Sequence, residues 1–553
     1  MEIKEAIAKL LEKELKGRIK HDEVESMLET PPTSDMGDFA FPCFKLSSIL
    51  KKNPVEIAKQ LEKEIKPKPP IEKIKANGPY LNFFSKTEDI FEKVLNIDEN
   101  FGKGNQKEKI LLEHTSINPN ASPHVGRTRN SIIGDSIYRV LTFLGNKVER
   151  HYYINDVSKQ VAILALDFKP KDKFEDLLDR YVKASKELEK NPEMEKKVFG
   201  LLNKFEHKDK KTTELFKKIV DTAIDGQKSI LSSIGIEFDY FDPESRYMEP
   251  AKEVLKELEK TGKVSKDRDN RTILNQKGTG LEWKMKAPIL VLTRSDGTGL
   301  YILRDLAYTI EKCKKGRNII ILGEDQKLYF EQLKQALILL RKPYPEVVHY
   351  SFVLLKDIGK MSTRRGEVVL LSEFLAEAKK KAEAEIKKRK TKGDALKIAI
   401  AAVKYSMLRN DNDKNITFDM EKSLNFEGDT GPYLQYAYAR ASSIMKKAKK
   451  KKEKTEQKPK IPKKLEESEI KLAKKILEFP ELVEKAGKSL QPSAIANYSF
   501  ELCQAFSGFY ANCKVIGADT EEQEQFRLKL VDSFRKTIKN SLYLLGIEVM
   551  EEM

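Results

Sequence analysis

Cysteine is scarce in this sequence: it occurs four times in 553 residues, and no CxxC or paired Cys/His spacing is present. Only Cys503 and Cys513 lie near one another along the chain. Such spacing indicates neither a zinc site nor the disulfide framework of a small secreted domain. We therefore expect ordinary reduced thiols and no protein-bound zinc.

Long hydrophobic runs and internal repeats are also missing. The first residues, MEIKEAIAKLLEKELKGRIK, have the pattern of a charged amphipathic helix and lack the continuous apolar stretch of a signal peptide. No segment reaches the roughly 20 apolar residues that cross a bilayer. The expectation is a cytoplasmic protein that makes no membrane contact.

Charge, in contrast, is plentiful. Charged residues make up 34% of the chain and aromatic residues 8%, which is typical of a soluble, folded protein. Lys and Arg number 103 against 86 Asp and Glu, and the net charge of +17 is spread along the chain. A positive excess attracts polyanions and favours a nucleic acid as the partner. The alternative is the Lys- and Glu-rich composition of hyperthermophile proteins, which reflects temperature rather than a partner.

A chain of this length is too long for one hydrophobic core, and we expect three domains. Residues 1–105 have the pattern of a small α/β domain, with helices around Met1–Leu28 and Asn53–Ile65 and a strand pair in IEKIKANGPYLNFF. Residues 372–553 are predicted to be helical apart from a short strand in NITFD. Their lysine-rich segment 446–464 cannot bury apolar surface and is expected to be a solvated loop, although contact with a phosphate backbone is an alternative.

The middle domain, residues 106–371, opens with the apolar run KILLEHTS. Helical patterns then alternate with the short β-rich runs GNKVERHYYIND, IGIEFDYFD, APILVLTRSDGTGLYILRD and RNIIILGED. This alternation predicts a mostly parallel sheet. Residues 167–222 are densely charged helix without strand signals, so we expect them to be a helical insertion in the sheet domain.

The first candidate site lies in LLEHTSINPNASPHVGRTRNSIIGDSIYRVL, where a loop joins a strand to a helix beginning near Gly126. The start of a helix presents unpaired N–H groups and a positive dipole end, which together suit a phosphate. Gly126 allows close approach, and His124 can hydrogen-bond a phosphoryl oxygen. An ordinary strand–helix turn with a capping histidine is the alternative.

The second candidate site is DIGKMSTRRGEVVLL, residues 357–371, a glycine-bounded loop with Lys360, Arg364 and Arg365 around a Met-Ser-Thr centre. Three cations on one loop suit the charge that develops on a polyphosphate during phosphoryl or nucleotidyl transfer. Taken alone, the segment could equally be a basic surface loop.

Taken together and in this order, PHVG and KMS resemble the two signatures of class I aminoacyl-tRNA synthetases. Seven segments resemble the arginyl-tRNA synthetase family, and in particular its archaeal members. They are EHTSINPNASPHVG, DGTGLYILRDLAY, GEDQKLYFEQL, KMSTRRG, GPYLQYAYAR, LLGIEVMEEM and the N-terminal GPYLNFF. The resemblance implies an α/β multidomain protein. Its parts would be an N-terminal tRNA-elbow-binding domain (1–105), a Rossmann-like catalytic domain (106–371) and a helical anticodon-binding domain (372–553).

The same resemblance implies an arginine pocket. The family holds the guanidinium with residues that match Glu113, Tyr301 and Asp305, and carboxylates are the acceptors that this planar cation favours. The i, i+4 spacing puts Tyr301 and Asp305 on one face if the segment is helical. Further matches would hold the amino and carboxylate ends of the substrate (Asn118, Gln326) or lie beside the pocket (Asp156, Gln160). For each acidic residue, a surface ion pair is the alternative.

For ATP, which would arrive as its Mg²⁺ complex, the resemblance implies binding and charge stabilisation by residues of both signatures: His124, Gly126, Arg127, Lys360, Met361, Ser362 and Arg364. Two positions depart from the family pattern. Arg127 stands where class I signatures end in histidine, and its role is open. Thr363 replaces the second lysine of the lysine signature, so we hypothesise that Arg364 or Arg365, helped by Arg127, serves the pyrophosphate.

Contacts with tRNA are implied at Asn82 in the N-terminal domain and at Tyr510 and Met553 in the C-terminal domain. Aromatic stacking on unpaired bases is the expected mode for Tyr510, and core packing is its alternative. A monomer is the default expectation. Three rivals remain: another class I synthetase or related nucleotidyltransferase, a catalytically silent tRNA-binding paralogue, and a general basic nucleic-acid binder. The pair Glu113 and Asp305 would serve no purpose for a neutral amino acid.

Overall fold

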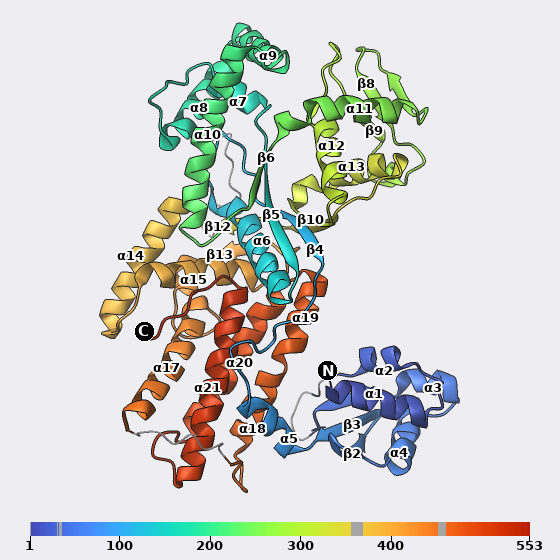
Figure 1. The fold of residues 1–553 in the computed structure, drawn as a ribbon, viewed down its shortest axis with the longest axis vertical. Helices are drawn as coiled ribbons and strands as arrows, with labels where there is room; N and C mark the ends of the chain where they lie inside the picture. The colour runs from blue at the N-terminus through green and yellow to red at the C-terminus, as the bar shows by residue number, and fades with distance from the viewer. Residues whose placement is uncertain (1, 30, 32–35, 356–368, 452–459) are drawn as a thin grey trace. The chain divides into compact units, whose positions relative to one another are not determined.

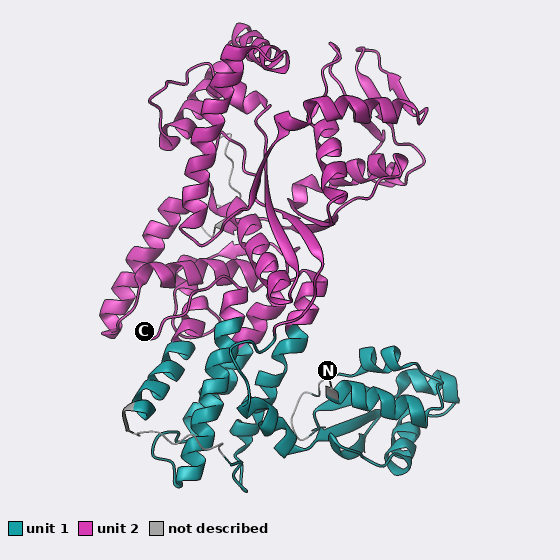
Figure 2. Ribbon diagram, viewed as in Figure 1, with its two compact units in different colours: residues 1–102, 437–482, 501–540 teal, residues 103–436, 483–500, 541–553 magenta. Residues whose placement is uncertain are grey.

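A computed structural model describes the chain except for residues 1, 30, 32–35, 356–368 and 452–459 (Figure 1). The chain forms two compact units (Figure 2): residues 1–102, 437–482 and 501–540 make up unit 1, and residues 103–436, 483–500 and 541–553 make up unit 2. Among the described residues, no helix is long and apolar enough to cross a membrane.

The N-terminal part of unit 1 is a three-stranded antiparallel sheet in the order β1-β3-β2, covered by helices. Its core includes the fully buried side chains of Ile7, Leu11, Phe41 and Leu81. The elements are α1 (Glu2–Glu14), α2 (His21–Met27), β1 (Phe39–Pro42), α3 (Phe44–Leu50), α4 (Pro54–Glu64), β2 (Ile71–Asn77), β3 (Tyr80–Ser85) and α5 (Thr87–Leu95). The prediction of an α/β arrangement with a β2–β3 pair and a helix near Asn53–Ile65 is confirmed.

One N-terminal prediction is wrong, because the helix expected over Met1–Leu28 is two helices. Lys16 and Gly17 adopt φ angles of 51° and 71°, which are left-handed conformations that end a helix. Apolar periodicity continues across this break, so the sequence pattern alone did not reveal it.

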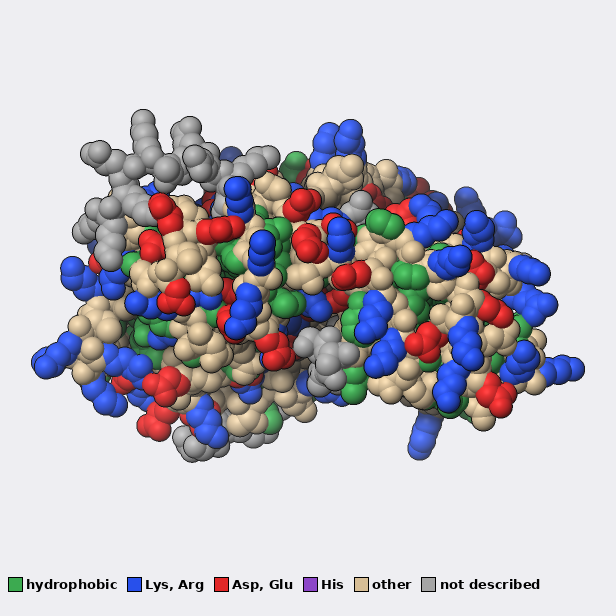
Figure 3. Space-filling view, turned by 90° about the horizontal axis from the view of Figure 1, so that it is seen from below, with side chains coloured by type: hydrophobic (Ala, Val, Ile, Leu, Met, Phe, Trp, Pro, Cys, Tyr) green, Lys and Arg blue, Asp and Glu red, His purple; other side chains and the backbone are tan. Residues whose placement is uncertain are grey.

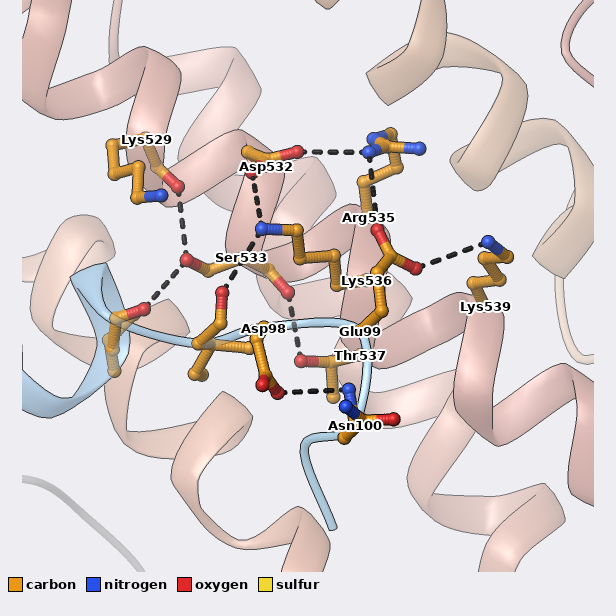
Figure 4. A network of polar contacts seen from close by, with 12 residues as sticks. Asp98, Glu99, Asn100, Lys529, Asp532, Ser533, Arg535, Lys536, Thr537 and Lys539 are labelled. Atoms are coloured by element: carbon orange, nitrogen blue, oxygen red, sulfur yellow. Dashed lines mark hydrogen bonds and ion pairs between the residues drawn. The ribbon is translucent and has the colours of Figure 1, made fainter. Parts of the chain in front are cut away.

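The C-terminal helices are α17 (Gly431–Lys451), α18 (Glu467–Leu477), α19 (Phe479–Ser489), α20 (Ser493–Asn512) and α21 (Glu521–Leu544). Within unit 1, the segment that follows α5 is fastened along α21 (Figure 4). The Ser533 hydroxyl donates to the Val94 carbonyl at 2.7 Å, and Lys536 Nζ donates to the Ile97 carbonyl at 3.1 Å. Glu99 adds an ion pair with Lys539 at 3.1 Å. The N-terminal residues and residues 521–540 of α21 therefore belong to one unit although they lie far apart in sequence.

Unit 2 is built on a five-stranded parallel sheet in the order β11-β10-β4-β5-β6 (Figure 1). The central strand β4 carries the fully buried Ile110, Leu111 and Leu112, as expected for a strand covered on both faces. The strands are β4 (Lys109–Glu113), β5 (Lys147–Ile154), β6 (Tyr240–Pro243), β10 (Arg317–Gly323) and β11 (Glu346–Tyr350). The predicted parallel sheet is confirmed.

The helix α6 (Val125–Phe143) follows β4, and two insertions interrupt the sheet order. The first comprises α7 (Lys159–Leu164), α8 (Phe174–Leu188), α9 (Pro192–Glu206) and α10 (Lys210–Ser232). The second, between β6 and β10, contains an antiparallel sheet and two helices: α11 (Met248–Glu259), β7 (Val264–Lys266), β8 (Thr272–Asn275), β9 (Ile289–Val291) and α12 (Tyr301–Cys313). The helix α13 (Lys327–Leu339) connects β10 to β11. The helical insertion was predicted at 167–222 and runs on to Ser232. The run APILVLTRSDGTGLYILRD was wrongly assigned to the parallel sheet, since its strand β9 pairs with β8 instead.

Unit 2 also contains β12 (Val353–Leu355) paired in parallel with β13 (Ile416–Phe418), and the helices α14 (Leu371–Arg389), α15 (Ala395–Leu408) and α16 (Met420–Ser423). The strand predicted in NITFD is β13. Residues of the C-terminal tail hydrogen-bond to this unit: the Ser136 hydroxyl donates to the Leu544 carbonyl at 2.8 Å, and Gln435 Nε2 donates to the Glu548 carbonyl at 2.8 Å.

Charge of both signs is visible on the face drawn in Figure 3, where Lys and Arg side chains are interspersed with those of Asp and Glu. On this face the net charge of +17 does not single out one path for a polyanion.

Candidate active site

The carboxyl edge of the parallel sheet gathers residues predicted from separate parts of the sequence. Glu113 is the last residue of β4, and β4 lies between β10 and β5. Asn118 and His124 follow β4, Asp156 follows β5, and Gln326 follows β10. In open α/β sheets the crevice at this edge is where ligands bind.

His124 is the N-cap of α6, which begins at Val125, next to the predicted helix start near Gly126, and its side chain makes no capping hydrogen bond. Its side chain is buried, and its Nδ1 has no hydrogen-bond partner among the described residues. Burial lowers the pKa of His124 to about 4, with the exposed Arg127 as a further cause. The imidazole is therefore neutral near pH 7, and its ring nitrogens can serve as one donor and one acceptor toward a ligand.

The chain returns to this helix start just after the second signature. The Val125 amide donates to the Val369 carbonyl at 3.0 Å, and the Leu371 amide donates to the Pro123 carbonyl at 2.9 Å. The residues proposed from the second signature lie outside the described part of the chain: Lys360, Met361, Ser362, Thr363, Arg364 and Arg365. Their flanking residue Val369 nevertheless lies beside the first signature.

The loop between β4 and α6 is fixed by buried side chains. Thr115 and Ser116 adopt φ angles of 75° and 46°, a left-handed conformation that is rare for residues other than glycine. Asn130 Oδ1 accepts from the Thr115 amide at 2.6 Å, and Gln227 Nε2 donates to the Asn118 and Ala121 carbonyls at 3.0 and 2.8 Å. Strained backbone held in this way is common at functional sites.

Glu113 is buried at the end of β4 and forms an ion pair with the buried Lys312 of α12. The Lys312 ammonium also lies 4.1 Å from the centroid of the Tyr308 ring. The alternative that Glu113 belongs to a surface ion pair does not apply, because both side chains are less than a tenth exposed.

Asp305 lies on the same helix as Tyr301, and a third residue joins them. The Tyr329 hydroxyl donates to Asp305 Oδ2 at 2.5 Å, and its ring stacks on the half-exposed Tyr301 with centroids 5.1 Å apart. Burial raises the pKa of Asp305 to about 6, and the charge of Glu113 adds to the rise, while Tyr329 and Lys312 oppose it. The two carboxylates thus lie close enough to interact, with an aromatic wall beside them.

The remaining pocket candidates differ in how their side chains are engaged. Asp156 accepts hydrogen bonds from the Ser245 amide and hydroxyl at 2.8 and 2.5 Å, so it fixes the turn after β6. Gln160 and Asn118 are half-buried, and Gln326 is exposed at the N-cap of α13.

Family models match almost the entire chain. The model described as "tRNA synthetases class I (R), catalytic domain" matches residues 91–420, which is more than half of the sequence. The chain belongs to the class I arginyl-tRNA synthetases. The "Arginyl tRNA synthetase N terminal domain" matches residues 1–85 of this synthetase, and the "DALR anticodon binding domain" matches residues 434–553.

Curated relatives and solved structures agree with this membership. The synthetase is 37% identical to the arginine–tRNA ligase of Methanocaldococcus jannaschii over 549 residues, which covers 95% of each chain, and 36% identical to that of Archaeoglobus fulgidus, covering 92% and 94%. The arginyl-tRNA synthetase of Thermus thermophilus has a similar structure, with a TM-score of 0.81 at 26% identity, covering 100% and 99%. The resemblance inferred from the motifs, including its archaeal character, and the α/β multidomain fold are confirmed.

The tRNA-contact candidates of the synthetase occupy different surroundings. Asn82 is buried in β3 with 4% exposure, and its Oδ1 lacks a hydrogen-bond partner among the described residues. Tyr510 is 44% exposed on α20, with the Arg440 guanidinium 5.2 Å from its ring centroid. Met553 is half-buried and packs against a small core that includes Ala378.

Several residues that build the site of the synthetase were not found from its sequence. Lys312 and Tyr329 contact the two carboxylates directly, and Gln227 and Arg129 hold the surrounding loops. Lys312 follows Asp305 by seven positions, which is two helical turns along the same face. This spacing could have identified Lys312 as a neighbour of the pocket. Nothing local in the sequence distinguished Gln227 from other polar residues of its charged helix.

Proposed function

We propose that this synthetase activates L-arginine with ATP and transfers it to the 3′-terminal adenosine of arginine-specific tRNA. The observation that carries the proposal is a pair of interacting carboxylates, the buried Glu113 at the sheet edge that also presents His124 and the partly buried Asp305 of α12. A guanidinium is the amino-acid side chain that such a pair suits, since it is planar and permanently charged.

In this proposal, Glu113 and Asp305 accept hydrogen bonds from the guanidinium, and the Tyr301 ring stacks beside it. Asn118 and Gln326 hold the amino and carboxylate ends of arginine, while Asp156 and Gln160 shape the pocket from β5 and α7. Glu113, Asn118, Asp156 and Gln326 lie at or just after the ends of parallel strands, and the ion pair of Lys312 with Glu113 brings α12, which carries Tyr301 and Asp305, to the same edge. One substrate can therefore reach both groups.

The arginine carboxylate attacks the α-phosphorus of ATP in line; the bond to the bridging oxygen breaks and pyrophosphate leaves. The terminal hydroxyl of tRNA then attacks the carbonyl of arginyl-adenylate and releases AMP. The neutral His124 donates a hydrogen bond to a phosphoryl oxygen, the Gly126 backbone and Arg127 bind the phosphates, and Lys360, Met361, Ser362 and Arg364 complete the ATP site. Mg²⁺ arrives with ATP and neutralises phosphate charge. Positioning and electrostatics supply the acceleration without a protein nucleophile.

For tRNA, we propose that the N-terminal domain (1–105) binds the elbow through Asn82, and that the helical domain (372–553) binds the anticodon loop through Tyr510 and Met553. The exposed ring of Tyr510 next to Arg440 supports a stacking role for Tyr510. We also propose that the catalytic domain spans residues 106–371. The protein is proposed to be a monomer in the cytoplasm.

The decisive experiment is ATP–pyrophosphate exchange with each amino acid, with and without tRNA. We expect exchange with arginine alone and only when tRNA is present. Exchange with another amino acid in place of arginine contradicts the proposal, whereas tRNA-independent exchange with arginine contradicts only the requirement for tRNA.

Arginine binding is expected to weaken as the pH falls through about 6. The pKa of Asp305 is raised to about 6, so below that pH its carboxyl group becomes neutral and loses the charge-assisted hydrogen bond. Affinity should fall by up to about tenfold per pH unit in this range. Calorimetric titration with arginine, repeated between about pH 5 and 8, measures the midpoint, and a dissociation constant unchanged over that range contradicts the prediction.

Alanine at both Arg364 and Arg365 is expected to lower the pyrophosphate-exchange rate by roughly a hundredfold, because charge on the leaving group then lacks its cations. Lys388→Ala, a change of an exposed lysine on α14, is the matched control and should leave the rate within about twofold. Exchange at the parental rate in both single arginine variants contradicts the hypothesis that either residue replaces the missing lysine.

A further inference from the structure

The ion pair between Lys312 and Glu113 is unusual in its surroundings. Lys312 is 2% exposed and Glu113 is 6% exposed, so both charged groups have lost most of their contact with water. They contact each other instead, and the Lys312 ammonium also contacts the Tyr308 ring. Burying two charges is costly unless both are well paired, and replacing such a pair with apolar residues is often neutral or stabilising. A buried pair at a substrate pocket therefore calls for a functional explanation.

The charges around the pocket can be counted. The Arg304 guanidinium pairs with Glu244 at 2.6 Å, and Asp242 contacts His151 Nδ1 at 2.7 Å and accepts from the Tyr308 hydroxyl at 2.9 Å. Asp156 accepts hydrogen bonds from Ser245. Each of these carboxylates thus has hydrogen-bond partners other than Lys312. The group that Lys312 contacts and influences most directly is the pair Glu113 and Asp305, two carboxylates with one ammonium.

We propose that Lys312 is a positioning residue of the arginine pocket: its ammonium holds the Glu113 carboxylate and cancels its charge, so that Asp305 is the uncompensated member of this pair. One arginine side chain then balances the charge of the pair. The inference rests on the proposed arginine site and goes beyond it. It makes Lys312, which need not touch the substrate, responsible for the preference of the pocket for a side chain with one positive charge.

The interaction between the two carboxylates supports this assignment. Burial is the main cause of the raised pKa of Asp305, the charge of Glu113 raises it further, and Lys312 lowers it. Without Lys312, two carboxylates would share the pocket uncompensated, and one of them would take up a proton near neutral pH. A protonated carboxyl group no longer provides the charge that a guanidinium requires.

The groups that face this set come from every element around it. They are Tyr301, Tyr308 and Cys313 on α12, Tyr329 on α13, Tyr153 and His151 on β5, Asp242 on β6, and Glu244 with Arg304. The tyrosine hydroxyls do not titrate near neutral pH, because burial raises the pKa values of Tyr153, Tyr308 and Tyr329 well above an ordinary value that is already alkaline. Glu244 has its pKa raised to about 7 by burial. When arginine affinity is measured against pH, a midpoint caused by the titration of Asp305 must therefore be distinguished from one caused by Glu244.

The test is the pH dependence of arginine binding to the full chain, measured by calorimetry with arginine alone. Lys312→Met is expected to move the midpoint upward by about one pH unit, because the opposing charge is gone. Arginine binding should then be about threefold weaker than in the parent at pH 6.5 and about eightfold weaker at pH 5.5. Lys312→Arg keeps the charge and is expected to restore the original midpoint. Lys315→Met, a change of a half-exposed lysine just after α12, is the matched control and should behave as the parent.

The double variant Lys312→Met with Glu113→Gln guards against misfolding, because it removes both members of the pair. Its midpoint is expected to return toward that of the parent, with affinity still reduced since Glu113 no longer accepts from the ligand. In steady-state exchange, Lys312→Met should raise KM for arginine more than it lowers kcat.

An unchanged midpoint in Lys312→Met overturns the inference, and so does tighter arginine binding, which would mean that Lys312 competes with the substrate for Glu113. A midpoint that stays high in the double variant also overturns it, because Glu244 would then be the titrating group. If the parent protein shows no arginine-dependent pyrophosphate exchange, the proposed function is wrong. That result differs from the binding results that would overturn the role of Lys312, so the two cases can be told apart.

Discussion

Asp305→Asn is expected to lower kcat/KM for arginine by a few hundred-fold without weakening the fold. Truncating one partner of a buried, hydrogen-bonded charge pair typically costs 2–5 kcal/mol, and each 1.4 kcal/mol corresponds to about tenfold. The asparagine keeps an oxygen that can accept from the Tyr329 hydroxyl. The loss should therefore fall on substrate binding rather than on packing.

The effect of Asp305→Asn on the free energy of unfolding follows from the raised pKa of Asp305. The pKa of Asp305 is raised by burial, so the folded protein binds a proton more tightly there than the unfolded chain does. Stability contributed by this group is present at low pH and is lost as the pH rises through about 6. Near pH 7.5 the carboxylate therefore destabilises the fold, and asparagine should leave the thermal midpoint equal or slightly higher.

Parallel kinetics and thermal unfolding check both statements. Glu311→Gln is the matched control, because Glu311 lies on the same helix in partly exposed ion pairs with Lys315 and Arg246. It should change kcat/KM by less than about twofold. If Asp305→Asn instead lowers the thermal midpoint and spares kcat/KM, Asp305 is a structural residue and the proposed pocket is wrong.

Arg129→Met is expected to produce the largest loss of stability. Arg129 is fully buried on α6, and its guanidinium donates to the carbonyls of Ser351 and Lys414 at 2.7 Å and of Asp411 at 3.0 Å. Methionine keeps the bulk and leaves three carbonyls without this donor, which should destabilise the protein by about 3–5 kcal/mol.

Urea unfolding measured on both variants tests this expectation. Arg317→Met is the control, since Arg317 makes partly exposed ion pairs with Glu346 and Glu108 and should lose less than about 1 kcal/mol. Equal unfolding midpoints for the two variants would show that water or neighbouring groups replace the guanidinium at Arg129.

The sequence predicted the parts of the site that local periodicity encodes. The strand ending at Glu113, the helix beginning after His124 and the shared face of Tyr301 and Asp305 each follow from spacing within about twenty residues. By contrast, the partner of Glu113 lies 199 positions away in Lys312, and a pairing at that distance leaves no local trace. Roles of individual residues came from family resemblance rather than from periodicity.

The errors have equally specific causes. The break between α1 and α2 depends on the backbone conformation at Lys16 and Gly17, which apolar spacing does not register. The run containing β9 has the composition of any strand, and whether it joins a parallel or an antiparallel sheet is decided by which strand it meets. Contacts between residues far apart in sequence, rather than local propensity, determine which sheet β9 joins and which residues contact Asp305.

The bonds between the C-terminal tail and the catalytic unit bear on how the protein is made. The residues near His124 leave the ribosome long before the partners of their helix, because Ser136 of α6 donates to the Leu544 carbonyl 408 positions later and Lys404 of α15 donates to the Gly546 carbonyl 142 positions later. Gly546 has a φ of 66°, and a Cβ there would come within 2.6 Å of Asp135 Oδ2 and Lys404 Nζ, so its place cannot readily be filled by another residue. A chain truncated before Leu544 therefore lacks two of the hydrogen bonds that hold α6 and α15, and α6 is the helix that begins at the candidate site.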